Sequence, residues 1–420
     1  MSQSFKPPRN NRLLTGVMQQ LAPWLCQYAY QGLRIEVSPE DLIRLRQYQG
    51  QRMLLLPNHP SPEDPLILFD LSRRLQEPFY FVAAREVFNY EGGLRGWLFQ
   101  QCGVYSVIRG AADRDSFKTT RDILYRGDRR LVIFIEGEIA YRNDRIIPFQ
   151  PGVLQLALRA QEDLIEEARK QSTEAPSLWV APLAIRYQVT EEAADDVLDQ
   201  AVSNLEKAVG LTVQTSASRY DRIRRVGETA LKTREELLGL SPASHATLTE
   251  RVHALQHRLL GRMEAYLDIP VNEPDAWLDR IRAIRNRMDR LTHVYDDTPG
   301  GSDYERQMRR GLAEVFRHFY ADLDRVVNLL TFEEGVLLKD TRPERYLELI
   351  RRLEKDILGQ RRTHLARTAK LQVGQIVDLH PHALAFAKEK RGTLQQLCHQ
   401  LETDMQQMLN PEEASVAALT

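Results

Sequence analysis

Short apolar runs alternate with helical patterns between residues 50 and 190, and this alternation constrains the fold more than any other feature. Each run spans five to eight residues, the usual length of a strand buried inside a sheet. Buried strands that alternate with helices are typical of α/β domains with a largely parallel sheet. The predicted strands are 53–57, 79–84, 104–108, 131–135 and 178–185, and helical patterns cover 66–75, 116–125 and 153–168.

The sequence changes character after about residue 195, where long, charged stretches with helical periodicity replace the strand patterns. A strand-like pattern returns at 371–379 and is followed by a helical pattern to about 409. We therefore expect an α/β fold with a mostly parallel mixed sheet flanked by helices, plus a large all-helical insertion or C-terminal region. The predicted parts are 1–34, an N-terminal amphipathic helical segment; 35–194, the α/β domain; 195–370, the helical region; and 371–420, a strand–helix segment that returns to the α/β domain.

Composition argues against several classes of protein. A formal net charge of −1 over 420 residues does not favour a nucleic-acid-binding protein. The three cysteines have no CxxC spacing, so they predict neither a disulfide framework nor a zinc site and fit a reduced compartment. No apolar run reaches the roughly 18–20 residues of a spanning helix. We expect a cytoplasmic protein without a transmembrane helix, bound peripherally at the cytoplasmic face of a membrane.

Residues 13–30 leave two interpretations open. The stretch is rich in apolar residues, includes Trp24 and Tyr28, and follows Arg9 and Arg12. Aromatic rings beside cations suit a helix that lies in a lipid interface, because the rings sit at headgroup depth and the cations meet anionic lipid. A first helix that packs on the core and is interrupted at Pro23 explains the pattern equally well.

The segment LLLPNHPSPEDP (54–65) carries the first candidate for chemistry. A buried strand leads to Asn58 and His59, and Asp64 follows His59 by five positions near a predicted helix start. Histidine titrates near neutral pH and can take a proton from an alcohol, while a carboxylate at its other ring nitrogen fixes the tautomer. The alternative is a structural histidine in a proline-rich turn, which is the commoner role for an isolated pair of this spacing.

Two further clusters end predicted strands, and a third lies within one. Arg109 closes CGVYSVIRG (102–110), and an arginine there can bind a phosphate through two parallel hydrogen bonds. Glu136 and Gly137 follow LVIFI; the glutamate can accept hydrogen bonds and the glycine permits a close backbone approach. Pro182 lies inside LWVAPLAIRY (178–187), which indicates a special role or an edge position for that strand. Each cluster alone has an ordinary structural explanation as a surface arginine, a turn or an edge strand.

In order and spacing, the four clusters resemble the four motif blocks of the phospholipid/glycerol acyltransferase family, typified by lysophosphatidic acid acyltransferases. NHPSPED resembles the first block, GVYSVIRG the second, FIEGE the third and VAPLAI the fourth, and FQPG (149–152) matches the family's habit after the third. The resemblance covers about residues 30–190 and resumes at 371–405. It implies a glycerol-phosphate acyltransferase-like fold.

The resemblance also implies the activity and its residues. The implied reaction is direct acyl transfer, with His59 as the base and Asp64 as the residue that orients it. Asn58, Arg109, Glu136, Gly137 and Pro182 are then the substrate-binding residues. Acyl-CoA or an acyl carrier protein supplies the acyl group as substrate, a (lyso)glycerophospholipid or glycerol phosphate accepts it, and no cofactor or metal is implied. The most specific expectation is a 1-acylglycerol-3-phosphate O-acyltransferase.

The third block departs from the family's usual Phe-Pro-Glu-Gly-Thr-Arg-Ser. This chain has Ile135 before Glu136-Gly137 and Glu138, Ile139 and Ala140 after them, so the usual arginine is missing. Arg142 or Arg145 compensates only if the loop folds back. The departure keeps open a tafazzin-like or other acyltransferase with a different acceptor. A non-catalytic membrane scaffold is a further alternative, and the helical region is then a partner surface; in an enzyme it is a lid or a docking face for a carrier protein.

Overall fold

The computed structural model of the chain describes residues 5–28, 32–85, 87–88, 93–108, 113–241, 245–270, 276–296, 303–329 and 342–410. These residues form two compact units. The sheet unit contains the described residues up to Val107, those of Asp113–Thr190 and those from Ala366 onward. The helical unit contains Ile108 and the described residues of Glu191–Leu365. Within the described residues, no helix is both long and apolar enough to cross a membrane.

One mixed sheet of eight strands forms the centre of the sheet unit as far as the structure describes it. Its order is β1-β7-β6-β2-β5-β3-β4, and β8 also pairs with β6. Every pairing is parallel except those of β6 with β7 and β8. The predicted fold class, a mostly parallel mixed sheet with a large helical region, is confirmed. The strands are β1 (Arg34–Val37), β2 (Arg52–Pro57), β3 (Tyr80–Ala84), β4 (Val104–Val107), β5 (Leu131–Val132), β6 (Leu178–Val189), β7 (Arg367–Val373) and β8 (Val377–Asp378).

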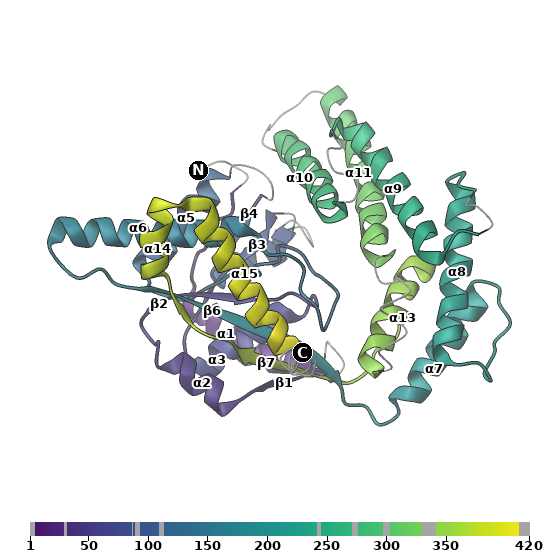
Figure 1. The fold of residues 1–420 in the computed structure, drawn as a ribbon, viewed down its shortest axis with the longest axis horizontal. Coiled ribbons are helices and arrows are strands. Elements are labelled where there is room, and N and C mark those ends of the chain that lie inside the picture. Colours follow the sequence, from purple (N-terminus) through teal and green to yellow (C-terminus); the bar gives the residue numbers. More distant parts are fainter. Residues whose placement is uncertain are drawn as a thin grey trace. The chain divides into compact units, whose positions relative to one another are not determined.

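Helices cover both faces of this sheet (Figure 1). Side chains alternate between the faces along a strand, so Met53 and Leu55 of β2 belong to one core cluster and Leu54 and Leu56 to the other. The first cluster contains residues of α1 (Arg12–Tyr28), α2 (Pro39–Arg46) and α3 (Asp64–Leu75), together with Cys102, which directly follows α4 (Leu94–Gln101). The second contains residues of α5 (Arg114–Arg126), α6 (Pro151–Gln171), α14 (Leu379–Lys388) and α15 (Lys390–Leu409).

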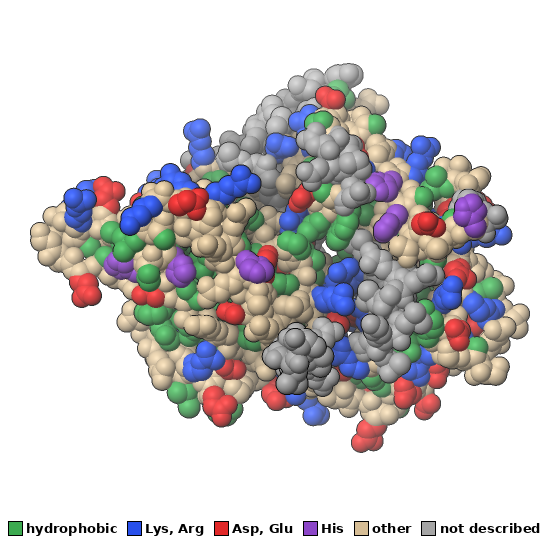
Figure 2. Space-filling view, in the orientation of Figure 1, with side chains coloured by type: hydrophobic (Ala, Val, Ile, Leu, Met, Phe, Trp, Pro, Cys, Tyr) green, Lys and Arg blue, Asp and Glu red, His purple; other side chains and the backbone are tan. Residues whose placement is uncertain are grey.

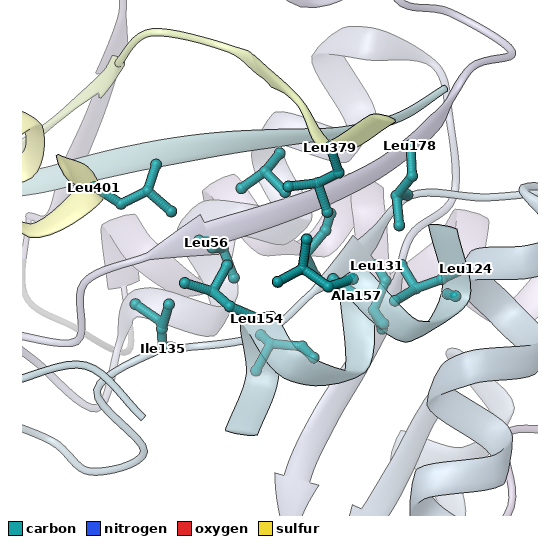
Figure 3. Close-up of a cluster of buried hydrophobic side chains, with 14 of the residues drawn as sticks. Leu56, Leu124, Leu131, Ile135, Leu154, Ala157, Leu178, Leu379 and Leu401 are labelled. Carbon is teal, nitrogen blue, oxygen red and sulfur yellow. The ribbon is translucent and has the colours of Figure 1, made fainter. Parts of the chain in front are cut away.

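The second core cluster joins the C-terminal segment to the rest of the sheet unit. Figure 3 shows side chains of this cluster that come from the sheet (Leu56 and Leu178), from α6 (Leu154) and from the last part of the chain (Leu379 and Leu401). All five are fully buried. The opposite side of this layer is solvated, and Figure 2 shows Lys and Arg side chains gathered over the corner between α14 and α15. The last two helices are therefore an integral layer of the α/β sandwich.

Residues 371–379, predicted as one strand, contribute the end of β7 and the whole of β8, which are separate. The break falls opposite Pro182 of β6. Gly374 donates its N–H to Pro182 O at 2.9 Å, and a Cβ on Gly374 would lie only 2.8 Å from Pro182 Cγ. Because Pro182 offers no N–H, the ladder on this side of β6 is interrupted where β7 gives way to β8.

Amphipathic helices make up the helical unit. Buried ion pairs join neighbouring helices, such as Arg222 with Glu206 at 2.8 Å and Arg280 with Glu264 at 2.7 Å. Thr247 and Glu250 form a capping box at the start of one helix, which satisfies its first backbone donors. The helices are α7 (Ala194–Ala208), α8 (Arg219–Leu237), α9 (Leu248–Leu267), α10 (Trp277–Asp296), α11 (Asp303–Leu329) and α13 (Pro343–Leu358).

Candidate active site

The candidate site lies at the carboxyl end of β2, in the middle of the sheet. Asn58 and His59 directly follow this strand, and α3 begins at Asp64. The chain continues beyond β5 alongside β2, since Ile133 N donates to Leu55 O at 3.0 Å, and so brings Glu136 to the same edge. Open α/β sheets usually bind their ligands at the carboxyl ends of parallel strands. The first and third sequence clusters therefore meet where such a fold places its chemistry.

His59 and Asp64 form a close pair. His59 Nδ1 lies 2.7 Å from Asp64 Oδ2, and the imidazole ring stacks on Phe134 with 4.1 Å between ring centroids. Because an ionised carboxylate only accepts hydrogen bonds, the proton of the neutral ring resides on Nδ1 and Nε2 keeps its lone pair. The His59 side chain is 14% exposed, whereas that of Asp64 is fully buried. This arrangement provides a base supported by a buried carboxylate.

Three donors hold the Asp64 carboxylate. Oδ2 also accepts from Ser61 N at 2.9 Å, and Oδ1 accepts from the hydroxyl of Tyr187. Burial raises the pKa of the Asp64 carboxyl above its ordinary value, while the hydrogen bonds and the charge of His59, the Tyr187 hydroxyl and Ser61 N–H oppose that rise. The turn between His59 and Asp64 is thus fixed around the carboxylate that supports the base.

Asn58 joins the motif to β6. Its Nδ2 donates to Ile185 O at 3.1 Å, its Oδ1 accepts from Ile185 N at 2.7 Å, and its own N–H donates to Leu183 O. The side-chain amide therefore pairs with a backbone residue as a peptide group would and extends the β2–β6 ladder by one step. Asn58 is 1% exposed, and in this structure it positions His59.

Glu136 holds the main chain on both sides of the site. Its Oε2 accepts from His59 N at 3.0 Å, and its Oε1 accepts from Ile147 N at 3.2 Å. The carboxylate is almost completely buried. Gly137 has φ +74°, and a Cβ there would approach Gln150 Cγ to 3.0 Å, so a side chain is unfavourable at this turn. Glu136 thus holds the backbone of His59, and Gly137 forms the turn that follows Glu136.

The loop after Gly137 folds back over the strand ends. Ala140 N donates to His59 O at 2.8 Å, and the Asn143 side chain exchanges two hydrogen bonds of 2.6 Å with the backbone of Tyr187. Arg142 in this loop is half-buried, whereas Arg145 is exposed. The loop therefore folds back, which is the condition for Arg142 or Arg145 to replace the arginine that this chain lacks in the third block.

α15 fastens the same loop from the C-terminal side. Gln406 accepts from Ile146 N at 3.2 Å and donates to Asp144 O at 2.8 Å, and Glu402 accepts from Phe149 N at 2.7 Å. Glu402 and Gln406 are four residues apart, so both project from one side of the helix. The C-terminal helix thus contributes directly to the shape of the candidate site.

Of the two remaining predicted residues, Pro182 is described by the structure and Arg109 is not. Pro182 is buried in β6, which lies between β2 and β7, so of the two explanations, a special role or an edge position, the edge position is wrong. The sheet tolerates it because the break between β7 and β8 leaves no strand partner that needs its N–H. Arg109 lies outside the described residues. The predicted substrate contacts of Asn58, Glu136, Gly137 and Pro182 stay predictions.

The sequence patterns did not single out Tyr187, Phe134, Asn143 or Arg367. Tyr187 stands two positions after Ile185 and so shares its face of β6, but that relation required the pairing of β6 with β2. Arg367 is more than three hundred residues from Glu63, its ion-pair partner at 3.3 Å. No group of three or more His, Cys, Asp or Glu side chains suited to a metal occurs in the described part of the chain.

A family model described as Acyltransferase matches residues 34–186, from the start of strand β1 to Arg186 within strand β6. This segment contains the His59–Asp64 pair and the Glu136-Gly137 turn and ends one residue before Tyr187. No curated protein matches the chain.

Proposed function

Residues 34–186 belong to the acyltransferase family, which transfers acyl groups to lipid-type acceptors, and on this premise we propose that the chain acylates a glycerol hydroxyl. The donor is an acyl thioester, and the acceptor is a (lyso)glycerophospholipid or glycerol phosphate, with 1-acylglycerol-3-phosphate as the first candidate. The observation that carries the proposal is the 2.7 Å contact between His59 Nδ1 and Asp64 Oδ2 at the carboxyl end of β2. It supports His59 as the base.

The proposed mechanism is a direct transfer. His59 Nε2 takes the proton of the acceptor hydroxyl as the oxygen attacks the thioester carbonyl, and Asp64 stabilises the imidazolium that forms. The tetrahedral intermediate then collapses with cleavage of the C–S bond. The imidazolium returns its proton to the departing thiolate, so that the free thiol and the acylated acceptor leave a neutral His59. No serine or cysteine nucleophile is required.

The exposed face of α1 supports contact with a lipid surface. Leu13, Val17, Leu21, Trp24 and Tyr28 recur at helical spacing and are 41–82% exposed. The adjoining helix α4, which contacts α1, exposes two more large apolar residues, Leu94 and Trp97. Exposed apolar side chains of this number mark an interaction surface. Arg9 and Arg12, both exposed, precede the face and suit anionic headgroups.

Release of free thiol from an acyl thioester in the presence of lysophosphatidic acid tests the proposal. His59→Ala should reduce turnover by about 10²–10⁴-fold, because that is the usual contribution of general-base catalysis. His399→Ala, an exposed histidine of α15, is the matched control and should retain full turnover. Near-normal turnover of His59→Ala with every acceptor would refute the assignment of the base.

The altered third block favours one alternative, a different acceptor for the same reaction. Glu138, Ile139 and Ala140 stand where the family usually has Thr-Arg-Ser, and Ala140 is bound to His59 O. A panel of glycerol phosphate, lysophosphatidic acid and lysophospholipids with larger headgroups distinguishes the acceptors. Thiol release with only the larger headgroups would favour a tafazzin-like or remodelling activity. Absence of thiol release throughout would favour the scaffold alternative.

A further inference from the structure

The buried surroundings of Asp64 extend beyond the segment that matches the family. Tyr187, near the end of strand β6, donates its hydroxyl to Asp64 Oδ1. The Tyr187 side chain is buried in the core cluster that also contains Met53 and Leu55 of β2. Its backbone is fixed separately by Asn143, so the hydroxyl is held in one position. The carboxylate oxygen that faces away from His59 therefore has a dedicated donor.

Arg367, the first residue of β7, secures Tyr187 from the opposite strand. Its guanidinium lies over the Tyr187 ring, 4.9 Å from the centroid, and its Nη2 lies 3.3 Å from Glu63 Oε1. Glu63 directly precedes Asp64, and its other oxygen accepts from the Ser61 hydroxyl. Arg367 and Glu63 are 11% and 6% exposed. A planar cation thus neutralises the buried carboxylate beside Asp64 and stacks on the ring that binds Asp64.

We propose that Tyr187 and Arg367 are positioning residues of the catalytic pair: the Tyr187 hydroxyl holds the Asp64 carboxylate, and Arg367 holds Tyr187 and Glu63. This inference rests on the proposed function of His59 and Asp64. It makes strand β7, which enters the sheet after the whole helical unit, part of the catalytic machinery. The reaction then depends on a residue far outside the family segment 34–186.

The charged and titratable groups around the pair determine the expected effect on pH dependence. Glu63 directly precedes Asp64, Arg367 of β7 pairs with Glu63, and Glu136, in the segment after β5, accepts from His59 N. Cys26 of α1 lies near Glu63 and Asp70. Burial, and then the nearby Asp70 and Glu63 carboxylates, raise the pKa of Cys26 to about 12, so the thiol stays neutral. Burial also raises the pKa of Tyr187 well above its ordinary value, so its hydroxyl stays a donor at physiological pH.

Removal of the Tyr187 hydroxyl should strengthen the binding of a proton to His59 beside the ionised Asp64 carboxylate. The donor disperses negative charge on Asp64, and it matters most when His59 is neutral, because a protonated imidazole is the stronger partner of the same carboxylate. In Tyr187→Phe we expect the pKa of His59 and the acid limb of kcat/KM to move up by about half to one pH unit. We expect kcat to fall roughly three- to tenfold through looser orientation of the base, with the KM of the donor unchanged.

Two measurements test this effect. Proton-detected titration of His59 in histidine-labelled protein, with the signal assigned by its loss in His59→Ala, needs no activity. The pH profile of kcat/KM gives the second value. Tyr105→Phe is the matched control, since Tyr105 is also fully buried and binds Thr120 Oγ1 at 2.6 Å in the other core cluster. It should destabilise the protein without moving either pH value.

Paired removal of the Arg367 and Glu63 charges provides a second test, because the second substitution should reverse the effect of the first on the pH profile. Arg367→Met removes the cation beside Glu63 and should also raise the acid limb, by about half a pH unit or more, since negative charge near the pair is no longer balanced. Glu63→Gln combined with Arg367→Met removes one charge of each sign and should return the limb to within about 0.3 units of wild type. Arg367→Lys keeps the charge but loses the planar contact, so it should lower kcat without a shift.

An unchanged His59 pKa and acid limb in Tyr187→Phe would overturn the inference, and so would an equal shift in Tyr105→Phe. These outcomes are independent of the fate of the proposed function. If His59→Ala retained activity, the proposed function would fail while the titration could still detect the Tyr187 contact. If His59→Ala were inactive and Tyr187→Phe had a normal profile, only the positioning roles would fail.

Discussion

Asp64 combines complete burial with a negative charge, and this combination is costly unless donors surround the carboxylate. His59 Nδ1, Ser61 N and the Tyr187 hydroxyl supply three donors. Burial nevertheless raises the pKa of the Asp64 carboxyl, so the donors do not fully replace water. A residue that is retained at such a cost is expected to serve the reaction more than the fold.

Asp64→Asn should therefore raise the free energy of unfolding while it abolishes most of the activity. The folded-state pKa of Asp64 lies above its unfolded value, so the wild type loses stability as pH rises from the ordinary Asp value through the folded pKa. The neutral amide lacks this loss. The stability gained in Asp64→Asn should be largest above the folded pKa and should vanish below the ordinary Asp value, as measured by urea titrations at several pH values.

Asp70→Asn is the control for this prediction. Asp70 is also fully buried on α3, but Arg73 and Arg74 bind its two oxygens at 2.6–3.0 Å. Removal of one partner from such a cluster usually costs stability, up to about 3–5 kcal/mol when the remaining charges stay buried. Asp64→Asn and Asp70→Asn should thus change stability in opposite directions. A loss of stability in both would contradict the interpretation of Asp64.

At the residue scale, the sequence predicted the pair but not its surroundings. The spacing of His59 and Asp64 is local, and a turn followed by a helix start brings such residues together. Tyr187 reaches Asp64 only because β6 pairs with β2, and Arg367 only because β7 pairs with β6. Neither residue has a sequence signature, since a tyrosine or arginine in a strand is ordinary. Long-range pairing decides which of them meets the site.

At the scale of elements, the strands that could be predicted are those that are continuous, apolar and buried on both faces. β2 and β6 follow the predicted runs, whereas the run 131–135 forms a strand only at Leu131–Val132 before the chain turns toward Glu136. β1 was not predicted, because its residues Arg34 and Glu36 interrupt the apolar pattern. Alternation of strands and helices was sufficient for the fold class and insufficient for the strand order.

α1 packs on the core, as one interpretation of its sequence predicted, while its contact with lipid stays a prediction. Ala22 and Cys26 are buried in the core, so the helix packs on the sheet unit, and the side that carries Val17 and Trp24 is exposed. Pro23 lies inside the helix without ending it. A helix of this kind can be held by the protein on one side and enter a lipid interface with the other.

Trp24→Ala should weaken binding to vesicles that contain anionic lipid by roughly tenfold, since loss of about 1.4 kcal/mol of interfacial contact corresponds to that factor. Trp24 is 55% exposed and its ring contacts the tilted Tyr28 ring with 5.2 Å between centroids, so its removal should leave the core unchanged. Cosedimentation with vesicles measures the effect. Gln20→Ala, an exposed position of the same helix, is the control and should bind normally. Equal binding of both variants would exclude α1 as the lipid contact.

At the scale of the whole molecule, the helical unit is inserted between two adjacent antiparallel strands. β6 ends with Val189 opposite Arg367, and Thr190 N donates to Ala366 O at 3.0 Å. Both connections to Glu191–Leu365 therefore leave from neighbouring positions of the sheet unit. These positions are close in sequence to Tyr187 and Arg367, the two residues that we assign to the support of Asp64. The change of character near residue 195 in the sequence reflects this insertion.

Replacement of Glu191–Leu365 by Asn-Gly should give a folded and catalytically competent sheet unit. The exchange joins Thr190 to Ala366 through a two-residue type I′ turn, which suits antiparallel strands already paired at their ends. Because the contacts of His59, Asp64, Tyr187 and Arg367 all lie within the sheet unit, turnover of a short-chain acyl thioester with a soluble acceptor should stay within about tenfold of wild type.

Thiol release and the His59 titration measure the outcome in the shortened chain. The informative control is a chain that instead ends after Thr190, which lacks β7, α14 and α15 as well as the helical unit. That chain loses Arg367, the contacts of α15 with the loop at 144–149, and eight of the 27 buried residues of the second core cluster, so it should be inactive. A shortened chain that folds with a normal His59 titration but has no turnover would assign the helical unit a direct part in catalysis. Equal activity of both chains would instead show that the return of the chain to the sheet is dispensable.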